Sequence, residues 1–176
     1  MSYVDRITPG DKAPSEIHVI VEIPKGSQNK YEYDTERGIV TLDRVLYSPL
    51  YYPGDYGFIP QTLGPDGDPV DALVLVTFPT YPGVLIRSRP IGVLEIVDHG
   101  EQDDKILCVP ADDVRFGSMR DLADIERPIL NEIDHFFAVY KELEGKKVEV
   151  TGWKGVARAH EIIEEGIAAW KEAQSS

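Results

Sequence analysis

Cysteine and histidine are scarce in this 176-residue sequence, and their scarcity excludes several kinds of site. The one cysteine, Cys108, cannot form an intrachain disulfide, so we expect a reducing compartment. It lies in the apolar segment 106-ILCVP-110, where the thiol pKa rises and packing is favoured over reactivity. The four histidines show no ligand spacing, so a zinc site is not expected. They are His18, His99, His135 and His160.

Positive charge is also in short supply. The chain carries 18 lysines and arginines against 31 aspartates and glutamates, a formal net charge of −13. Because proteins bind nucleic acids mainly through lysine and arginine, this balance argues against a nucleic-acid partner. No uncharged apolar run is long enough to span a bilayer, and the amino-terminal residues lack the features of a signal peptide. We therefore expect a cytoplasmic protein with no membrane association.

Short extended segments dominate the first two thirds of the chain, whose length suits one domain spanning residues 1–176. Apolar residues alternate with others in 17-IHVIVEI-23, as they do in a strand. Further strands, separated by Gly, Pro and Asp, are expected at 30–34, 39–45, 72–78, 84–89, 91–97 and 105–109. Many short strands with turns between them are typical of a barrel or a sandwich.

Helical periodicity is confined to the carboxyl-terminal part. In residues 124–145 the apolar positions recur at three- and four-residue spacings, and Gly145 is placed to end the helix. These positions are Ile125, Ile129, Ile133, Phe136, Phe137 and Tyr140. A last strand is expected at 146–153, before a second helix with a stripe of Val156, Ile163, Ile167 and Trp170. The expected fold is α+β, a five-stranded β-barrel with additional strands and two helices packed on it.

The segment 66-DGDPVDA-72 is the strongest local indication of function. It places Asp66, Asp68 and Asp71 within six residues, where their charges repel unless a cation lies among them. A polar turn is the simpler alternative. However, the apolar run that follows from Ala72 anchors the cluster to a strand, and an all-oxygen ligand set suits Mg²⁺ or Mn²⁺. A calcium-binding loop is excluded because Val70 and Asp71 occupy its fifth and sixth positions.

Other charged residues lie in strand-like segments. Asp98 ends one strand, and Asp103 and Lys105 share a face at the start of the next. An exposed charged hairpin is the simpler explanation of this pattern. Lys30 and Glu32 likewise share a face, where a cross-strand ion pair is the simpler account. Together with Arg44, Glu22 and several tyrosines, these groups suit metal-assisted chemistry on a phosphate compound.

Five collinear segments of the sequence resemble family I soluble inorganic pyrophosphatases, in which the three aspartates of 66-DGDPVDA-72 are metal ligands. The other four segments are 20–34, 39–62, 89–106 and 135–153. The resemblance implies that Asp66, Asp71 and Asp103 bind the activating metals, with Asp68 and Asp98 joining them. It implies that Glu22 and Glu32 are outer metal-site groups, and that Tyr52 is a supporting residue. The phosphate contacts it implies are Lys30, Arg44, Tyr56, Lys105, Tyr140 and Lys141.

The same resemblance implies a barrel of the oligonucleotide-binding topology, a homohexamer, and hydrolysis of pyrophosphate to two orthophosphates. The cofactor would be Mg²⁺, with Mn²⁺ or other divalent ions as possible substitutes. Asp68 would act as general base toward a metal-activated water, which attacks in line without a covalent intermediate, while Tyr56, Lys30 and Arg44 complete the catalytic set. Two alternatives remain at this point: a phosphohydrolase acting on nucleotides, although no glycine-rich phosphate loop is present, and a binding module without turnover.

Overall fold

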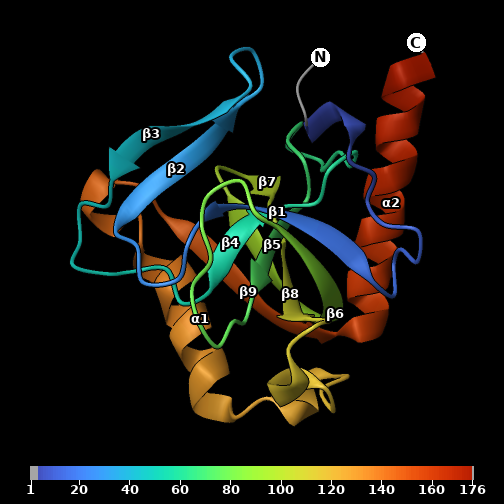
Figure 1. Ribbon diagram of the computed structural model, residues 1–176. Helices are drawn as coiled ribbons and strands as arrows, with labels where there is room; N and C mark the ends of the chain where they lie inside the picture. Colours follow the sequence, from blue (N-terminus) through green and yellow to red (C-terminus); the bar gives the residue numbers. More distant parts are fainter. Residues whose placement is uncertain (1–3, 176) are drawn as a thin grey trace.

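The computed structural model describes residues 4–175, and its centre is a barrel-like ring of five strands (Figure 1). The strands are β1 (Ile17–Ile23), β4 (Asp55–Phe58), β5 (Asp71–Val74), β8 (Lys105–Pro110) and β6 (Leu85–Asp98). Each strand pairs with the next, and β6 pairs again with β1. The pairing of β5 with β8 is parallel, whereas the other pairings of the ring are antiparallel. This arrangement confirms the expected barrel with oligonucleotide-binding topology.

Four further strands lie outside the ring. The strand β9 (Val148–Gly155) pairs along β6, and the short β7 (Glu101–Gln102) forms a hairpin with the end of β6. The strands β2 (Asn29–Asp34) and β3 (Ile39–Val45) form a separate two-stranded sheet that projects from the barrel (Figure 1). We call this unit the β2–β3 hairpin. Residues 29–45 include no buried residue, and the hairpin contacts the core through the partly buried side chains of Tyr31 and Tyr33.

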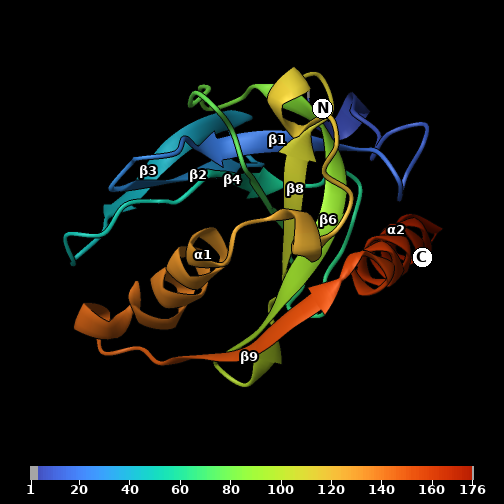
Figure 2. The same cartoon turned by 90° about the horizontal axis from the view of Figure 1, so that it is seen from below.

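The two α-helices cover different parts of the barrel, and β9 runs from one to the other (Figure 2). The helix α1 (Arg127–Val139) packs on β9, and α2 (Val156–Ser175) packs on β6 and β9. Four short 3₁₀ helices lie between other elements: η1 (Val4–Arg6), η2 (Val114–Phe116), η3 (Leu122–Asp124) and η4 (Glu142–Glu144). Among the residues that the structure describes, no helix has both the length and the apolar character of a membrane span.

Two large apolar clusters make up most of the core. One cluster joins α1 to the barrel and includes Phe136, Phe137, Tyr52 and Leu94, all buried. The second joins α2 to the opposite face of the same strands through residues such as Ile163. Removal of one such side chain from water is worth about 1.5–3 kcal/mol. The helices are therefore held by burial of their apolar faces rather than by their intrinsic helix propensity.

Element boundaries differ from the sequence expectation where backbone chemistry interrupts the pattern. The expected strands 84–89 and 91–97 are one strand, β6, with a shift in register between Pro90 and Gly92, because proline has no N–H for the ladder. The expected strand 72–78 is shorter, since β5 ends at Val74. The strand β4 was not expected, because all four of its residues are buried and show no alternation.

The first helix is also shorter than expected. It ends at Val139, and Gly145, in a left-handed conformation with φ of 73°, instead ends η4. Leu130 faces the core, whereas Ile129, expected on the apolar stripe, is 40% exposed. Tyr140, the residue after the helix, keeps a helical conformation with φ of −63° and donates its backbone N–H to Phe136, and both Tyr140 and Lys141 line the larger cavity described below.

One glycine allows β1 and β4 to approach each other. A Cβ atom at Gly57 would lie 1.9 Å from the carbonyl oxygen of Ile20, so no larger residue fits. We expect Gly57→Ala to lower the free energy of unfolding by about 3 kcal/mol through this backbone clash. Gly155→Ala is the control, because its nearest neighbouring heavy atoms lie 4.0 Å away. Urea denaturation measures both, and equal losses in the two variants would contradict the close approach.

Candidate active site

A cavity of about 1130 Å³ opens at the mouth of the barrel and gathers most of the charged residues identified in the sequence. Its wall is formed by residues of η1, β1, β2, β4, β5 and β8, together with the loop before β5, the β6–β7 turn, the segment after α1 and the end of α2. The expected site residues on this wall are Glu22, Lys30, Glu32, Tyr56, Asp66, Asp68, Asp71, Asp98, Asp103, Lys105, Tyr140 and Lys141. Residues far apart in the sequence thus face one space.

Residues 59–70, which we call the acidic loop, connect β4 to β5 and carry two of the three clustered aspartates. Gly67 has a φ of 88°, which glycine adopts without strain. The side chain of Asp66 accepts a hydrogen bond from the backbone N–H of Asp68 at 3.1 Å, so the loop tip forms an Asx-type turn. Asp68 is exposed to solvent, and Asp71 begins β5 at the base of the loop.

Lys105 is the cation that lies among these carboxylates. Its Nζ atom is 2.7 Å from Asp71 and 2.8 Å from Asp103, and its side chain is only 4% exposed. The parallel pairing of β5 with β8 places Asp71 directly beside Lys105, which explains the contact. The ammonium group also lies 5.6 Å from the centre of the Tyr56 ring and 5.8 Å from that of Phe137.

Burial and these ion pairs compete in setting the pKa values. Burial alone would lower the pKa of Lys105, but Asp71 and Asp103 outweigh it and raise that pKa, so the lysine stays charged. Burial raises the pKa of Asp71 even with Lys105 beside it. Burial acts in the same direction on Asp103, but there Lys105 outweighs it and the pKa falls. Burial also raises the pKa of Glu22 to about 7, although the backbone N–H of Tyr33 opposes this shift.

Two further lysines are paired with carboxylates around the cavity. Lys141 contacts Asp98, and Lys30 contacts Glu32 and lies 3.4 Å from Asp43. Burial would lower the pKa of Lys141, but Tyr140 and Asp98 outweigh it and raise that pKa. Each lysine therefore offers a positive charge to the cavity while holding a neighbouring carboxylate.

The tyrosines supply rigid hydroxyl-bearing walls. Tyr140 is stacked on Phe136 with ring centres 5.2 Å apart and meets Phe137 edge-on at 5.8 Å. Its ring therefore packs in the core while the residue lines the cavity. Tyr56 lies against the same aromatic group, 6.0 Å from Phe137, and burial raises the pKa of its hydroxyl well above the ordinary value. The Tyr56 hydroxyl group thus stays protonated and able to donate a hydrogen bond.

Two expected site residues do not lie on the cavity wall. Arg44 pairs with Lys30 across the β2–β3 hairpin, and its guanidinium contacts Asp43 and Glu144, with Nε 2.9 Å from the latter. Tyr52 is buried behind the wall, with its ring centre 5.5 Å from that of Tyr56 and 4.8 Å from that of Phe136. This position suits the supporting role expected for Tyr52.

The cavity is also lined by residues that the sequence patterns did not assign to a functional site, among them His99, Gln61, Tyr31 and Trp170. His99 and Gln61 have positive φ angles of 52° and 53°, which are uncommon outside glycine. The turn sequence 98-DHG-100 is the one available signal for His99. Trp170 was expected on the apolar stripe of the second helix, and this position gave no sign of the cavity.

The donor groups in the cavity fit a hard divalent cation, although within residues 4–175 no three His, Cys, Asp or Glu side chains are already placed to hold one ion. The atoms on offer are carboxylate oxygens, which Mg²⁺ and Mn²⁺ prefer. Asp98 Oδ1 is buried and has no hydrogen-bond partner among the described residues, as expected of an atom reserved for another ligand. Lys105 neutralises Asp71 and Asp103 in this structure.

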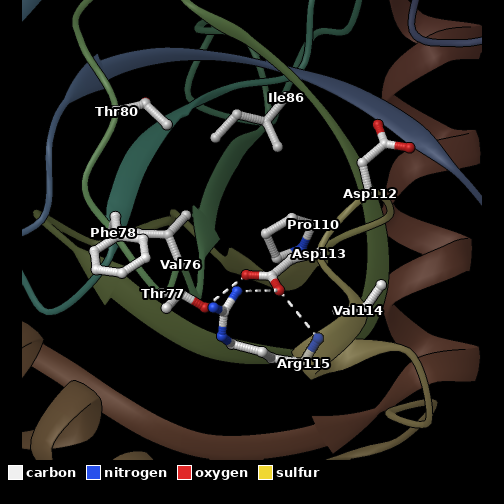
Figure 3. Close-up of a pocket in the computed structure, with 10 residues that line it drawn as sticks. All are labelled: Val76, Thr77, Phe78, Thr80, Ile86, Pro110, Asp112, Asp113, Val114 and Arg115. Carbon is white, nitrogen blue, oxygen red and sulfur yellow. Dashed lines mark hydrogen bonds and ion pairs between the residues drawn. The ribbon is translucent and has the colours of Figure 1, made fainter.

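A second, smaller cavity of about 350 Å³ lies between the end of β8, η2 and the loop after β5 (Figure 3). Its wall is mainly apolar, with Val76, Phe78 and Val114 among its residues. The carboxylate of Asp113 is already engaged, because it accepts hydrogen bonds from the Thr77 hydroxyl at 2.5 Å and the Arg115 backbone at 3.0 Å. This cavity therefore lacks the convergent free groups of an active site.

Comparisons with known proteins agree with the geometry of the larger cavity. Residues 19–171 match the family described as inorganic pyrophosphatase. The inorganic pyrophosphatase of Geobacillus stearothermophilus is 51% identical over 156 residues, which cover 89% of this chain and 94% of that protein. That of Haloferax volcanii is 50% identical over 164 residues, 93% of each chain. The crystal structure of the Thermus thermophilus enzyme superposes with a TM-score of 0.92 at 46% identity, covering 96% of this chain and 98% of that one.

The fold and the carboxylate-lined cavity thus define a class of metal-dependent hydrolase built on an oligonucleotide-binding barrel. Within that class, the chain belongs to the inorganic pyrophosphatase family. The family resemblance inferred from its five sequence segments is confirmed.

The buried position of Lys105 leads to a prediction for the metal-free protein. We expect Lys105→Met to lower the free energy of unfolding by about 3–5 kcal/mol, because it leaves two carboxylates facing each other without a cation. The control is Arg87→Met, which removes an exposed ion pair with Asp112 and should barely change stability. Urea unfolding in the presence of a chelator measures both variants. Equal stability of Lys105→Met and the parent would show that the ion pairs do not hold the site together.

Proposed function

We propose that the protein hydrolyses inorganic pyrophosphate to two orthophosphates with divalent ions, Mg²⁺ first among them and Mn²⁺ as a substitute. The observation that carries the proposal is one cavity in which carboxylates from the acidic loop, from β5 and from the turn between β7 and β8 face Lys30, Lys105 and Lys141. Carboxylates suit the metals, and ammonium groups suit the phosphates of a highly charged anion. Membership of the inorganic pyrophosphatase family supports the choice of substrate.

The carboxylates fall into two groups in this proposal. Asp66, Asp71 and Asp103 hold the metals, joined by Asp68 and Asp98, while Glu22 and Glu32 act on them through water. A bound divalent ion supplies acidity, because it lowers the pKa of a water molecule that it carries. Asp68 accepts the proton of that water as general base, and its exposed position at the tip of the acidic loop leaves it free to do so.

The cations and hydroxyl groups bind the substrate. Asp71, Asp103 and Asp98 would hold the divalent ions, which would supply positive charge in place of the paired lysines, and the ammonium groups of Lys105 and Lys141 would then be available to phosphate oxygens. Lys30 acts from the β2–β3 hairpin, where Arg44 is its cross-strand partner, and the hydroxyl groups of Tyr56 and Tyr140 donate hydrogen bonds to the substrate. These donors stabilise the negative charge that develops on the leaving phosphate during in-line attack by water. No covalent intermediate with the protein is needed.

We also propose a single domain spanning residues 1–176, a cytoplasmic location, in keeping with the lone cysteine, and a homohexamer that binds no nucleic acid. Large apolar side chains at the surface support self-association. Phe78 is 72% exposed and Val114 89%, and both line the smaller cavity, so they form one exposed apolar patch of the kind found at protein–protein interfaces. Sedimentation velocity at micromolar concentration is expected to give the mass of six chains, and a monomer there would contradict the assembly.

Phosphate release from pyrophosphate, with and without Mg²⁺, tests the activity. We expect release with the metal and almost none in the presence of a chelator. No release with Mg²⁺ would leave a binding module as the better description, whereas equal turnover of ATP would favour the broader phosphohydrolase.

Asp68→Asn tests the general base. We expect a rate about 10²–10⁴ times lower, because the amide cannot accept the proton of water, with the fold retained. Asp112→Asn is the matched control, since it changes an exposed aspartate outside the cavity. Steady-state rates at saturating Mg²⁺ compare the two variants, and near-normal activity of Asp68→Asn would exclude its role as base.

A further inference from the structure

The base of the acidic loop is held by a buried hydroxyl group. Thr62 is 2% exposed, and its hydroxyl donates to the carbonyl oxygen of Ile59 at 2.6 Å while accepting from the backbone N–H of Val70 at 3.0 Å. The backbone N–H of Ile59 bonds directly to the carbonyl oxygen of Val70 at 2.9 Å. One half of an antiparallel hydrogen-bonded pair is therefore direct, and the other half passes through the Thr62 side chain.

The Thr62 hydroxyl group, placed between the backbones of Ile59 and Val70, sets the distance between the two ends of the acidic loop. Without the hydroxyl, the backbone N–H of Val70 and the carbonyl of Ile59 either stay buried and unpaired or close directly onto each other. Either response moves Val70, and Asp71 is the next residue in the chain. The position of Asp71 relative to Asp66 and Asp68 thus depends on a hydroxyl group that is engaged by two backbone groups of the loop.

The helix α2 fixes the same loop from outside (Figure 1). The backbone N–H of Leu63 donates to the carbonyl oxygen of Gly166 at 2.9 Å. A Cβ atom at Gly166 would lie 2.7 Å from Val70 Cγ2 and 3.3 Å from the Cβ of Thr62, so only glycine lets the helix approach this closely. Gly166 is costly within a helix, and its close packing offsets that cost.

We infer that Thr62, backed by Gly166, is a positioning residue that sets the spacing of the loop aspartates and thereby the affinity for divalent metal. This inference rests on the proposed function, because it concerns the same carboxylates. The geometry gives it three independent contacts: a hydroxyl bridge across the loop mouth, a backbone bond from the loop to α2, and a steric limit at residue 166.

The test is Thr62→Val, which keeps the size of the side chain and removes the hydroxyl, beside Thr62→Ser, which retains it. Mn²⁺ binding is measured by isothermal titration calorimetry without pyrophosphate. We expect the dissociation constant of Thr62→Val to rise about tenfold, as for other groups that orient metal ligands, and that of Thr62→Ser to stay near the parent value. Thr77→Val is the matched control, because it removes a hydroxyl bonded to Asp113 outside the site.

Rates separate positioning from a general loss of structure. At saturating Mg²⁺ the kcat of Thr62→Val should return to within about twofold of the parent, because every proposed ligand is still present, while the Mg²⁺ concentration for half activation rises. Gly166→Ala displaces the loop from the helix side without touching the hydroxyl, so it should weaken Mn²⁺ binding even though alanine favours the helix. If Thr62→Val does not fold, Mn²⁺ binding by Gly166→Ala tests the inference instead.

Three results would overturn the inference: parent-like Mn²⁺ binding in Thr62→Val, equal weakening in Thr62→Ser and Thr62→Val, or parent-like binding in Gly166→Ala. The first result, beside normal binding in the parent, would remove the role of Thr62 and leave the proposed function intact. A parent protein that binds neither Mn²⁺ nor Mg²⁺ would overturn both.

Discussion

The repulsion between carboxylates at the barrel mouth is the constraint on which the site depends. Lys105 relieves it by lying between Asp71 and Asp103, where it is almost wholly removed from solvent. A buried ammonium is itself costly without partners, so the lysine and the two aspartates stabilise one another. Their placement follows from the parallel pairing of β5 and β8, which brings the first residue of one strand beside the first residue of the other.

The remaining parts of the site are arranged around this group. The acidic loop enters from β4, the β6–β7 turn brings Asp98, and the early end of α1 brings Tyr140 and Lys141. Buried aromatic rings pack beneath the cavity wall, so the charged groups lie against a rigid apolar layer. The low solvent exposure of this layer strengthens the ion pairs, because water is kept from competing with them.

Local patterns in the sequence were enough to predict most strands and both α-helices, but they did not predict which strands pair with each other. The strands 17–23 and 39–45 were predicted with the observed limits, because alternation is a local property. The parallel β5–β8 pair and the β1–β4 and β1–β6 pairs join residues more than thirty positions apart, and no local pattern contains that information. Similarly, Asp66, Asp68 and Asp71 stood out as a cluster, while the ion pair of Lys105 with Asp71 required the fold. Periodicity placed Tyr140 in the core, which describes its ring but not its position on the cavity wall.

The β2–β3 hairpin makes one side of the cavity less stable than the other. It carries Lys30 and Glu32, yet none of its residues is buried, and a two-stranded sheet has little stability alone. The wall formed by β5 and β8, in contrast, belongs to the core. Local opening of the hairpin therefore requires far less free energy than unfolding of the barrel. The side of the cavity formed by β5 and β8 is therefore the more rigid one, and the side formed by the β2–β3 hairpin is the more easily displaced.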